Sequence, residues 1–136
     1  MMKQTLSIEQ MKHLKELGLD TSNASMHYQF LPTADSIING TDEIEKEPCL
    51  FVSQPNMEHE YPAYTLQDIL GKLPCFIDTH VLTLQKLANS GTCLYMEPYS
   101  RSILNLTESK ELIDAAYEML CWCIEKGYVK VGMEEK

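Results

Sequence analysis

Residues 107–127 read TESKELIDAAYEMLCWCIEKG, and this stretch decides the fold more than any other part of the chain. Thr107 can accept a hydrogen bond at a helix start, acidic residues follow in the first turn, and Gly127 is a natural stop. We therefore predict a helix over residues 108–126, which is long for a chain of this size. Its apolar face should lie on a sheet and contains Leu112, Ala116, Leu120 and Cys123.

The opposite side of this helix carries our candidate partner-contact residues. Glu118 and Glu125 lie on one acidic stripe, and Trp122 falls beside that stripe instead of on the apolar face. Tryptophan is enriched at binding hot spots. The alternative is that a strand, a loop or the chain's own tail covers Trp122. The apolar arc is also wide, which leaves a homodimer open because such a helix needs cover on more than one side.

Two shorter helices are predicted upstream from their capping residues. Ser7 and Gln10 have the spacing of a capping box and begin a helix over residues 8–17. Thr65 and Asp68 have the same spacing and begin a helix over residues 66–73.

Alternating apolar residues predict the strands. They indicate a strand over residues 26–30, with Tyr28 and Phe30 in the core, and a short buried strand over 49–52 that contains Phe51. Residues 76–96 have the pattern of an antiparallel hairpin, and 102–106 and 128–131 are further candidate strands. The predicted class is α+β: a small, mostly antiparallel sheet packed by two to three helices, with a long C-terminal helix.

The length of 136 residues suits one domain, so we expect residues 1–136 to form a single domain. Residues 33–63 lack a clear period and contain several acidic residues, so we expect a mobile surface excursion there. Residues 132–136 are expected to form a loose tail.

The charge balance excludes some partners. Twenty acidic residues face eleven basic ones, which gives a net charge of −9, and Arg101 is the only arginine. Such a chain is a poor candidate for direct contact with nucleic acid or with an anionic membrane surface. It has no run of about 18 apolar residues and no secretory signal, and its five cysteines are irregularly spaced. We therefore expect reduced thiols and a cytoplasmic location.

No catalytic, cofactor or metal residues are predicted. Cys121 and Cys123 would project about 200° apart on a helix, so they cannot bind one metal together. The four histidines share no ligand spacing, and no phosphate-binding glycine loop occurs. Cys75 and His80 could form a dyad only if the fold brought them together.

Three stretches carry a resemblance: LKELGLDTSNASM at 14–26, YTLQDIL at 64–70 and DAAYEMLCWCIE at 114–125. In this order they resemble a family of small uncharacterised proteins of gut Bacteroidetes, often phage-derived or carried on mobile elements. The most specific run is Leu-Cys-Trp-Cys-Ile in the C-terminal helix. The resemblance covers about a quarter of the chain. It implies a bacterial cytosolic setting and an accessory role in mobile DNA, and it implies no activity, cofactor or site residue.

Three functional hypotheses follow. The first is a non-enzymatic protein-binding accessory protein of bacterial or prophage origin, with an unidentified protein partner and with Trp122, Glu118 and Glu125 as candidate contacts. The second is an acidic DNA-mimic inhibitor of a nuclease or other DNA-binding protein, which rests on the net charge. The third is a cryptic cysteine-dependent enzyme, which requires a thiol of low pKa.

Overall fold

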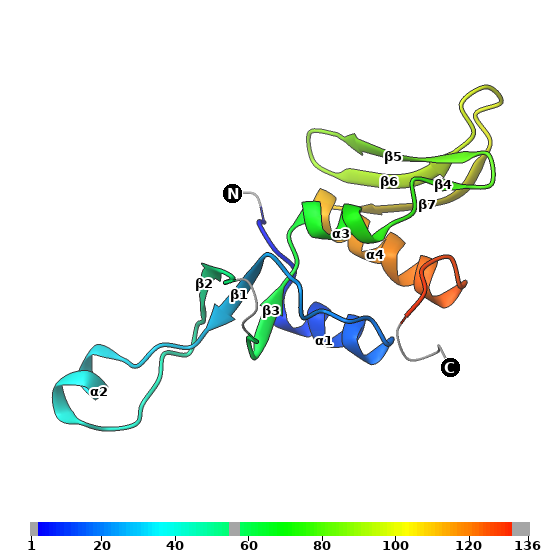
Figure 1. The fold of residues 1–136 in the computed structure, drawn as a ribbon. Coiled ribbons are helices and arrows are strands. Elements are labelled where there is room, and N and C mark those ends of the chain that lie inside the picture. Colours follow the sequence, from blue (N-terminus) through cyan, green and yellow to red (C-terminus); the bar gives the residue numbers. More distant parts are fainter. Residues whose placement is uncertain (1–2, 55–57, 132–136) are drawn as a thin grey trace.

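The computed structural model describes residues 3–54 and 58–131 and has an α+β fold (Figure 1). The α+β class, the antiparallel pairing and the packing of a C-terminal helix on a sheet are confirmed. Within the described residues the helices are α1 (Ile8–Glu16), α2 (Ala34–Asn39), α3 (Leu66–Lys72) and α4 (Leu112–Glu125). The strands are β1 (Met26–Gln29), β2 (Cys49–Val52), β3 (Tyr61–Ala63), β4 (Phe76–Ile77), β5 (His80–Lys86), β6 (Gly91–Met96) and β7 (Ile103–Ser109).

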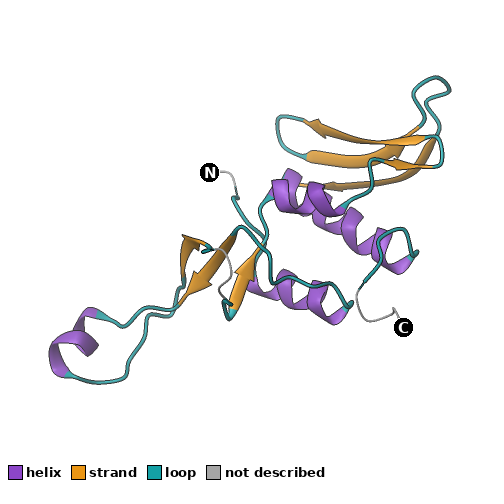
Figure 2. Ribbon diagram, viewed as in Figure 1, coloured by secondary structure: helices purple, strands orange, loops and turns teal. Residues whose placement is uncertain are grey.

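The strands divide between two sheets, whereas the sequence analysis predicted one. One sheet has three strands in the order β2-β1-β3, and the other has four in the order β4-β5-β6-β7. Figure 2 shows α3 and α4 on one face of the four-stranded sheet, with α1 beside β3. The described residues therefore form four helices and two sheets, where two to three helices on a single sheet were expected.

Local capping chemistry correctly located two of the helix starts. The Ser7 hydroxyl accepts from the Gln10 amide at 3.1 Å, and the Gln10 side chain accepts from the Ser7 amide at 2.9 Å. Thr65 and Asp68 form the same reciprocal pair at the start of α3. Each pair satisfies two amides that a helix start leaves without partners.

The start of α4 differs from the prediction. The helix begins at Leu112 instead of residue 108, because β7 continues to Ser109, which pairs with Gly91 of β6. Thr107 therefore lies in a strand, and its hydroxyl donates to the Ala115 carbonyl at 2.7 Å. The residue preceding the helix, Glu111, makes no side-chain capping bond. Thr107 therefore pairs in the sheet, whereas the sequence analysis had expected it to cap the helix.

The main core lies between the four-stranded sheet, α4, α3 and α1. Tyr64, Tyr95, Met119 and Leu120 are among its fully buried side chains. The three-stranded sheet is less well covered, and Phe51, which we predicted to be core, is 37% exposed.

Residues 128–131 form no strand. Instead, they turn back onto α4 after Gly127, which has a positive φ of 84°. The amide of Tyr128 donates to the Cys123 carbonyl at 2.8 Å, and Val129 and Val131 pack against the core. The predicted tail at 132–136 lies outside the described residues.

Candidate functional site

The predicted contact residues on α4 do not form one exposed cluster. Glu118 and Glu125 are exposed, whereas Trp122 packs against the core and is half-buried. Its ring centroid lies 5.4 Å from that of Tyr128, with the two planes tilted by 36°. The chain's own segment after α4 therefore partly covers Trp122, which is the alternative that the sequence left open.

The acidic stripe of α4 is partly neutralised at its N-terminal end. The Lys3 ammonium lies 2.7 Å from an oxygen of Asp114, and the Gln10 amide donates to the same oxygen at 2.9 Å. The Lys3 backbone amide donates to Glu111 at 3.3 Å. These bonds join the N-terminal segment to α4, so Glu118 and Glu125 are the fully exposed part of the stripe.

The wide apolar arc of α4 already has intramolecular cover. One side packs on β6 and β7, another lies beside α3, and the segment at 128–131 covers a third. Because this arc is covered within the chain, its width no longer predicts a dimer through α4.

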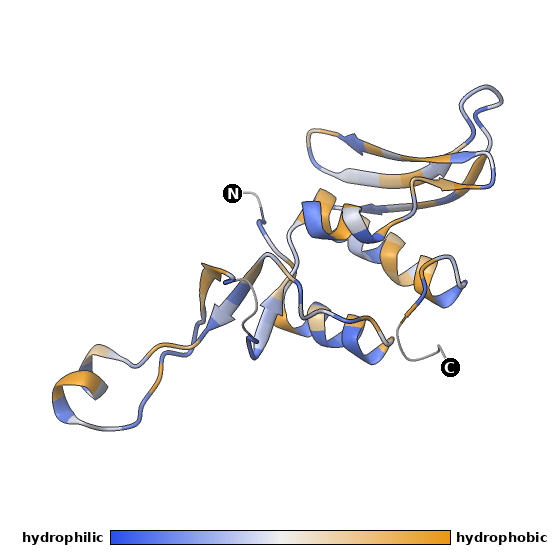
Figure 3. Ribbon diagram, in the orientation of Figure 1, coloured by the Kyte–Doolittle hydropathy of each residue, from blue (hydrophilic) through white to orange (hydrophobic). Residues whose placement is uncertain are grey.

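Three strongly exposed isoleucines lie on a projection at residues 30–48, which we call the arm. The arm continues β1 and β2 as a narrow ribbon, with Glu45 donating its amide to the Leu31 carbonyl at 2.8 Å. Its tip is the six-residue helix α2, capped by Thr33 and followed by Gly40 in the left-handed region at φ 70°. Figure 1 shows α2 far from the other helices, and Figure 3 shows hydrophobic residues on it.

The arm exposes isoleucines that a folded chain normally covers. Ile37 is 70% exposed, Ile38 is 78% exposed and Ile44 is 57% exposed. The only buried residue of α2 is Ser36, whose hydroxyl donates to the Thr41 carbonyl at 2.6 Å. The sequence analysis expected a surface excursion over 33–63 and named no site there. In the structure the arm spans 30–48, and residues 49–52 and 61–63 belong to the three-stranded sheet. The available signal was the pair Ile37-Ile38 between turn-forming residues, with the small Ala34 as the one apolar neighbour at helical spacing.

Two stacked imidazoles lie at the base of the arm. His27 of β1 is buried, and its ring centroid is 3.7 Å from that of His59 at an interplanar angle of 12°. Its Nδ1 lies within hydrogen-bond distance of the Ser53 hydroxyl at 3.2 Å. Burial lowers the pKa of His27, and the charge on His59 lowers it further. His27 thus takes the core position that we had assigned to its neighbour Tyr28.

This pair does not make a metal centre. Nowhere in residues 3–54 and 58–131 do three or more histidine, cysteine or acidic side chains form a group that could hold a metal ion. Face-to-face stacking also directs the ring nitrogens outward in parallel planes, so they do not converge on one point.

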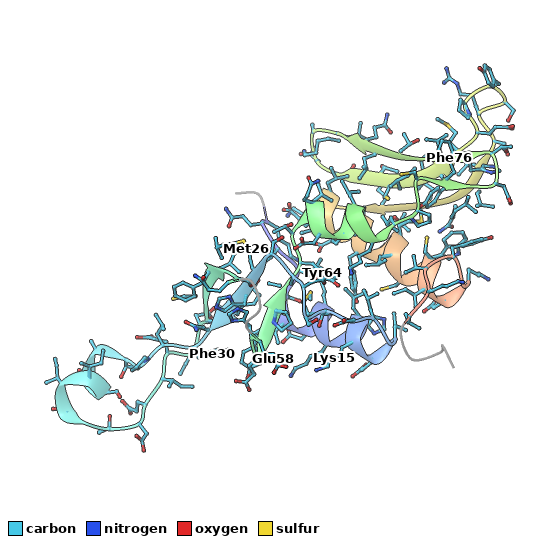
Figure 4. All side chains as sticks on the ribbon, viewed as in Figure 1. Lys15, Met26, Phe30, Glu58, Tyr64 and Phe76 are labelled. Carbon is cyan, nitrogen blue, oxygen red and sulfur yellow. The ribbon has the colours of Figure 1, made fainter. Side chains whose placement is uncertain are left out.

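A hollow of about 390 Å³ lies between α1 and residues 58–62. Met11 and Leu19 form part of its apolar floor. Figure 4 labels Lys15 and Glu58 on its two walls, and both residues are exposed. The volume would suit a small ligand. However, its charged groups lie on long exposed side chains, and such groups are not held in the fixed geometry that catalysis requires.

The five cysteines are all free, and the fold exposes them to different degrees: Cys93 and Cys123 are buried, and Cys121 is half-buried. Cys49 and Cys75 are exposed. Burial raises the pKa of Cys93 to about 12 and that of Cys121 and Cys123 to about 11. A cysteine-dependent enzyme needs a thiol of lowered pKa that is ionised at neutral pH, whereas the pKa of each of these three thiols is raised.

We expect a thiol reagent at neutral pH to modify Cys49 and Cys75 rapidly and the other three cysteines only after unfolding. The thiolate is the reactive form, and burial both suppresses it and blocks access. The measurement is the time course of Ellman's reagent on the native chain and in denaturant. A C49S/C75S variant is the control, and rapid native modification of that variant would contradict the prediction.

The described residues contain no helix that has both the length and the apolar character needed to cross a membrane. Comparison of the chain with protein-family models, curated proteins and solved structures found no match.

Proposed function

We propose that this chain is a non-enzymatic accessory protein that binds another protein through the arm. The observation that carries the proposal is the exposure of Ile37, Ile38 and Ile44 on a projection held away from the core. Burying an isoleucine side chain contributes roughly 1.5–3 kcal/mol. A partner that covers two of them gains roughly 3–6 kcal/mol from this burial, which corresponds to a change in Kd of about a hundredfold or more, since about 1.4 kcal/mol changes a Kd tenfold.

The charge of the arm indicates the chemistry of this partner. Five acidic residues and one lysine lie between residues 30 and 48: Asp35, Asp42, Glu43, Glu45, Glu47 and Lys46. Acidic groups around an apolar centre complement a groove that is apolar inside and basic at its rim. We therefore propose a protein partner with such a groove.

The proposed setting is the cytoplasm of a bacterium, in keeping with a prophage or other mobile-element origin. Five free cysteines suit a reducing compartment. The family resemblance of the three stretches described above supports the bacterial and phage-related part of the proposal.

Replacing Ile37 and Ile38 together by Asp should weaken partner binding at least about tenfold, because the apolar contacts are lost and buried charge is added. Stability should change little, since both side chains are exposed and mutations at exposed positions away from special features usually cost under about 0.5 kcal/mol. A photo-reactive amino acid at position 38 of the parent chain first identifies the partner by cross-linking in host cells. The partner is then titrated against the parent chain and against the Ile37/Ile38 variant, and the two Kd values are compared.

The matched control carries Glu118→Gln and Glu125→Gln on α4, which tests the other candidate contact surface. We expect this variant to bind as the parent does, and binding through the arm should weaken as salt rises. Equal binding of the parent and the Ile37/Ile38 variant would disprove the role of the arm. Selective loss of binding in the α4 variant would return the contact to Glu118, Glu125 and the adjacent Trp122.

A further inference from the structure

The four-stranded sheet has one covered face and one open face. On the covered face, Asn105 of β7 donates to the sulfur of Met119 in α4 at 3.7 Å, and Thr107 bonds to Ala115. Cys93 and Tyr95 of β6 belong to the same core. Side chains alternate between the two faces along a strand, so the residues that directly precede and follow these four strand residues in sequence lie on the opposite face. We call this opposite face the outer face. In Figures 1 and 2 no helix or strand covers it.

The outer face is apolar across all four strands at the end that contains Phe76, and polar at the other end, where Gln85, Thr92 and Glu108 lie. The pairing places Phe76 beside Val81, Val81 beside Met96, Met96 beside Ile103, and Leu94 beside Leu106. Phe76 is 63% exposed, Ile103 49% and Leu106 45%, and Figure 4 labels Phe76 on this sheet. Leu94 is buried by its neighbours but lies outside the main core. A continuous apolar patch of this kind marks an interaction site.

The distribution of charge favours a second copy of the chain on this face. Two chains of net charge −9 repel one another, so they can associate only where acidic residues are few. On the strand positions of the outer face, Glu108 is the only ionisable side chain. Arg101 lies in the turn at the opposite end of β7. Neither residue forms an ion pair within the described part of the chain.

The size of the face is compatible with a dimer interface. Strands β5, β6 and β7 are six or seven residues long and span roughly 14 by 22 Å in projection, and the two-residue strand β4 widens one end. This is the size of a small, reversible interface, below the area of about 800 Å² per partner that standard interfaces bury. Interfaces of homodimers are also more apolar than those of transient complexes.

We propose that a second copy covers the outer face, with the two-fold axis running across the strands near Asn105, midway along β7 between Arg101 and Glu108. This axis stacks β7 of one copy antiparallel on β7 of the other. Leu106 then lies near its own equivalent, and Arg101 of each copy lies opposite Glu108 of the other. The surface is self-complementary, as a two-fold interface requires. The arm lies at the other end of the molecule, so this interface is independent of the partner site.

The test is the mass of the chain by light scattering and sedimentation over a concentration series. The parent should form a dimer, and Leu106→Glu should raise the dimer dissociation constant at least about a hundredfold, because the charge would be buried against its own equivalent. Ile38→Glu is the matched control, since it places the same charge on an exposed apolar residue of the arm. Its dimerisation should equal that of the parent, and circular dichroism checks that each variant folds.

A charge exchange tests the proposed axis without touching the apolar patch. Arg101→Glu should weaken the dimer about tenfold, and adding Glu108→Arg should restore it. Both side chains are exposed, so the fold should tolerate these changes. A parent chain that is monomeric throughout the series overturns the proposal, as does a Leu106→Glu chain that dimerises like the parent. Failure of the double exchange to restore the dimer overturns the antiparallel arrangement.

Discussion

Replacing Tyr95 by Ala is expected to lower the free energy of unfolding by about 3–5 kcal/mol, the usual cost of truncating a buried aromatic side chain. Tyr95 is the fifth of the six residues of β6, is fully buried, and packs in the core with α4. Its hydroxyl donates to the Pro74 carbonyl at 2.7 Å, which joins the sheet to the segment after α3. Removing the ring leaves a cavity between the sheet and the helices. Denaturant unfolding followed by circular dichroism measures the change.

A second variant at Tyr95 separates the contribution of the hydroxyl from that of the ring, and a variant at Tyr99 is the control. Tyr95→Phe keeps the ring and removes only the hydroxyl, so it should cost about 1–3 kcal/mol, because the Pro74 carbonyl loses its donor. Tyr99→Ala removes an aromatic side chain that is 97% exposed, and it should change stability by less than about 0.5 kcal/mol. Similar losses for Tyr95→Ala and Tyr99→Ala would contradict the position of the core.

Adding a single methyl group at Gly91 is expected to destabilise the chain by about 1–3 kcal/mol or more. A Cβ built on Gly91 would lie 2.6 Å from the Cα of Leu112 and 2.8 Å from its Cβ. Because the nearest atom is backbone, no side-chain rotation relieves the overlap, and the start of α4 must move away from β6. Thermal unfolding of Gly91→Ala measures the loss.

Gly71→Ala is the matched control for this substitution. Gly71 lies within α3, and no atom lies within 4 Å of the added Cβ. Alanine is the better helix former, so this variant should gain up to about 1 kcal/mol. Opposite signs for two identical substitutions would identify Gly91 as the point of close approach between β6 and α4. A neutral Gly91→Ala variant would show that α4 lies farther from the sheet.

The two surfaces proposed for binding lie at opposite ends of the molecule. Figure 3 shows the arm at one end and the four-stranded sheet at the other. A dimer formed through the outer face would therefore leave both arms free. Such a chain could bind two copies of a partner at once, which increases avidity without any new contact.

The sequence by itself determined the features that depend on neighbours along the chain. Ser7 with Gln10, and Thr65 with Asp68, specify helix starts because capping bonds join residues three positions apart. The alternation at 82–85 and 92–96 likewise specified two strands of a hairpin. The acidic composition and the apolar face of α4 could also be read from the sequence.

Only the tertiary structure decided which of these elements meet. Pairing of β7 with β6 moved the start of α4 past Thr107, and a separate three-stranded sheet buried His27 and left Phe51 partly exposed. The return of the chain after Gly127 partly covered Trp122, for which the helix wheel had left both a binding role and cover by the chain's own tail open. The open face of the second sheet also became visible only in the fold. These outcomes depend on contacts between residues far apart in sequence, and the local spacing of apolar and polar residues does not encode such contacts.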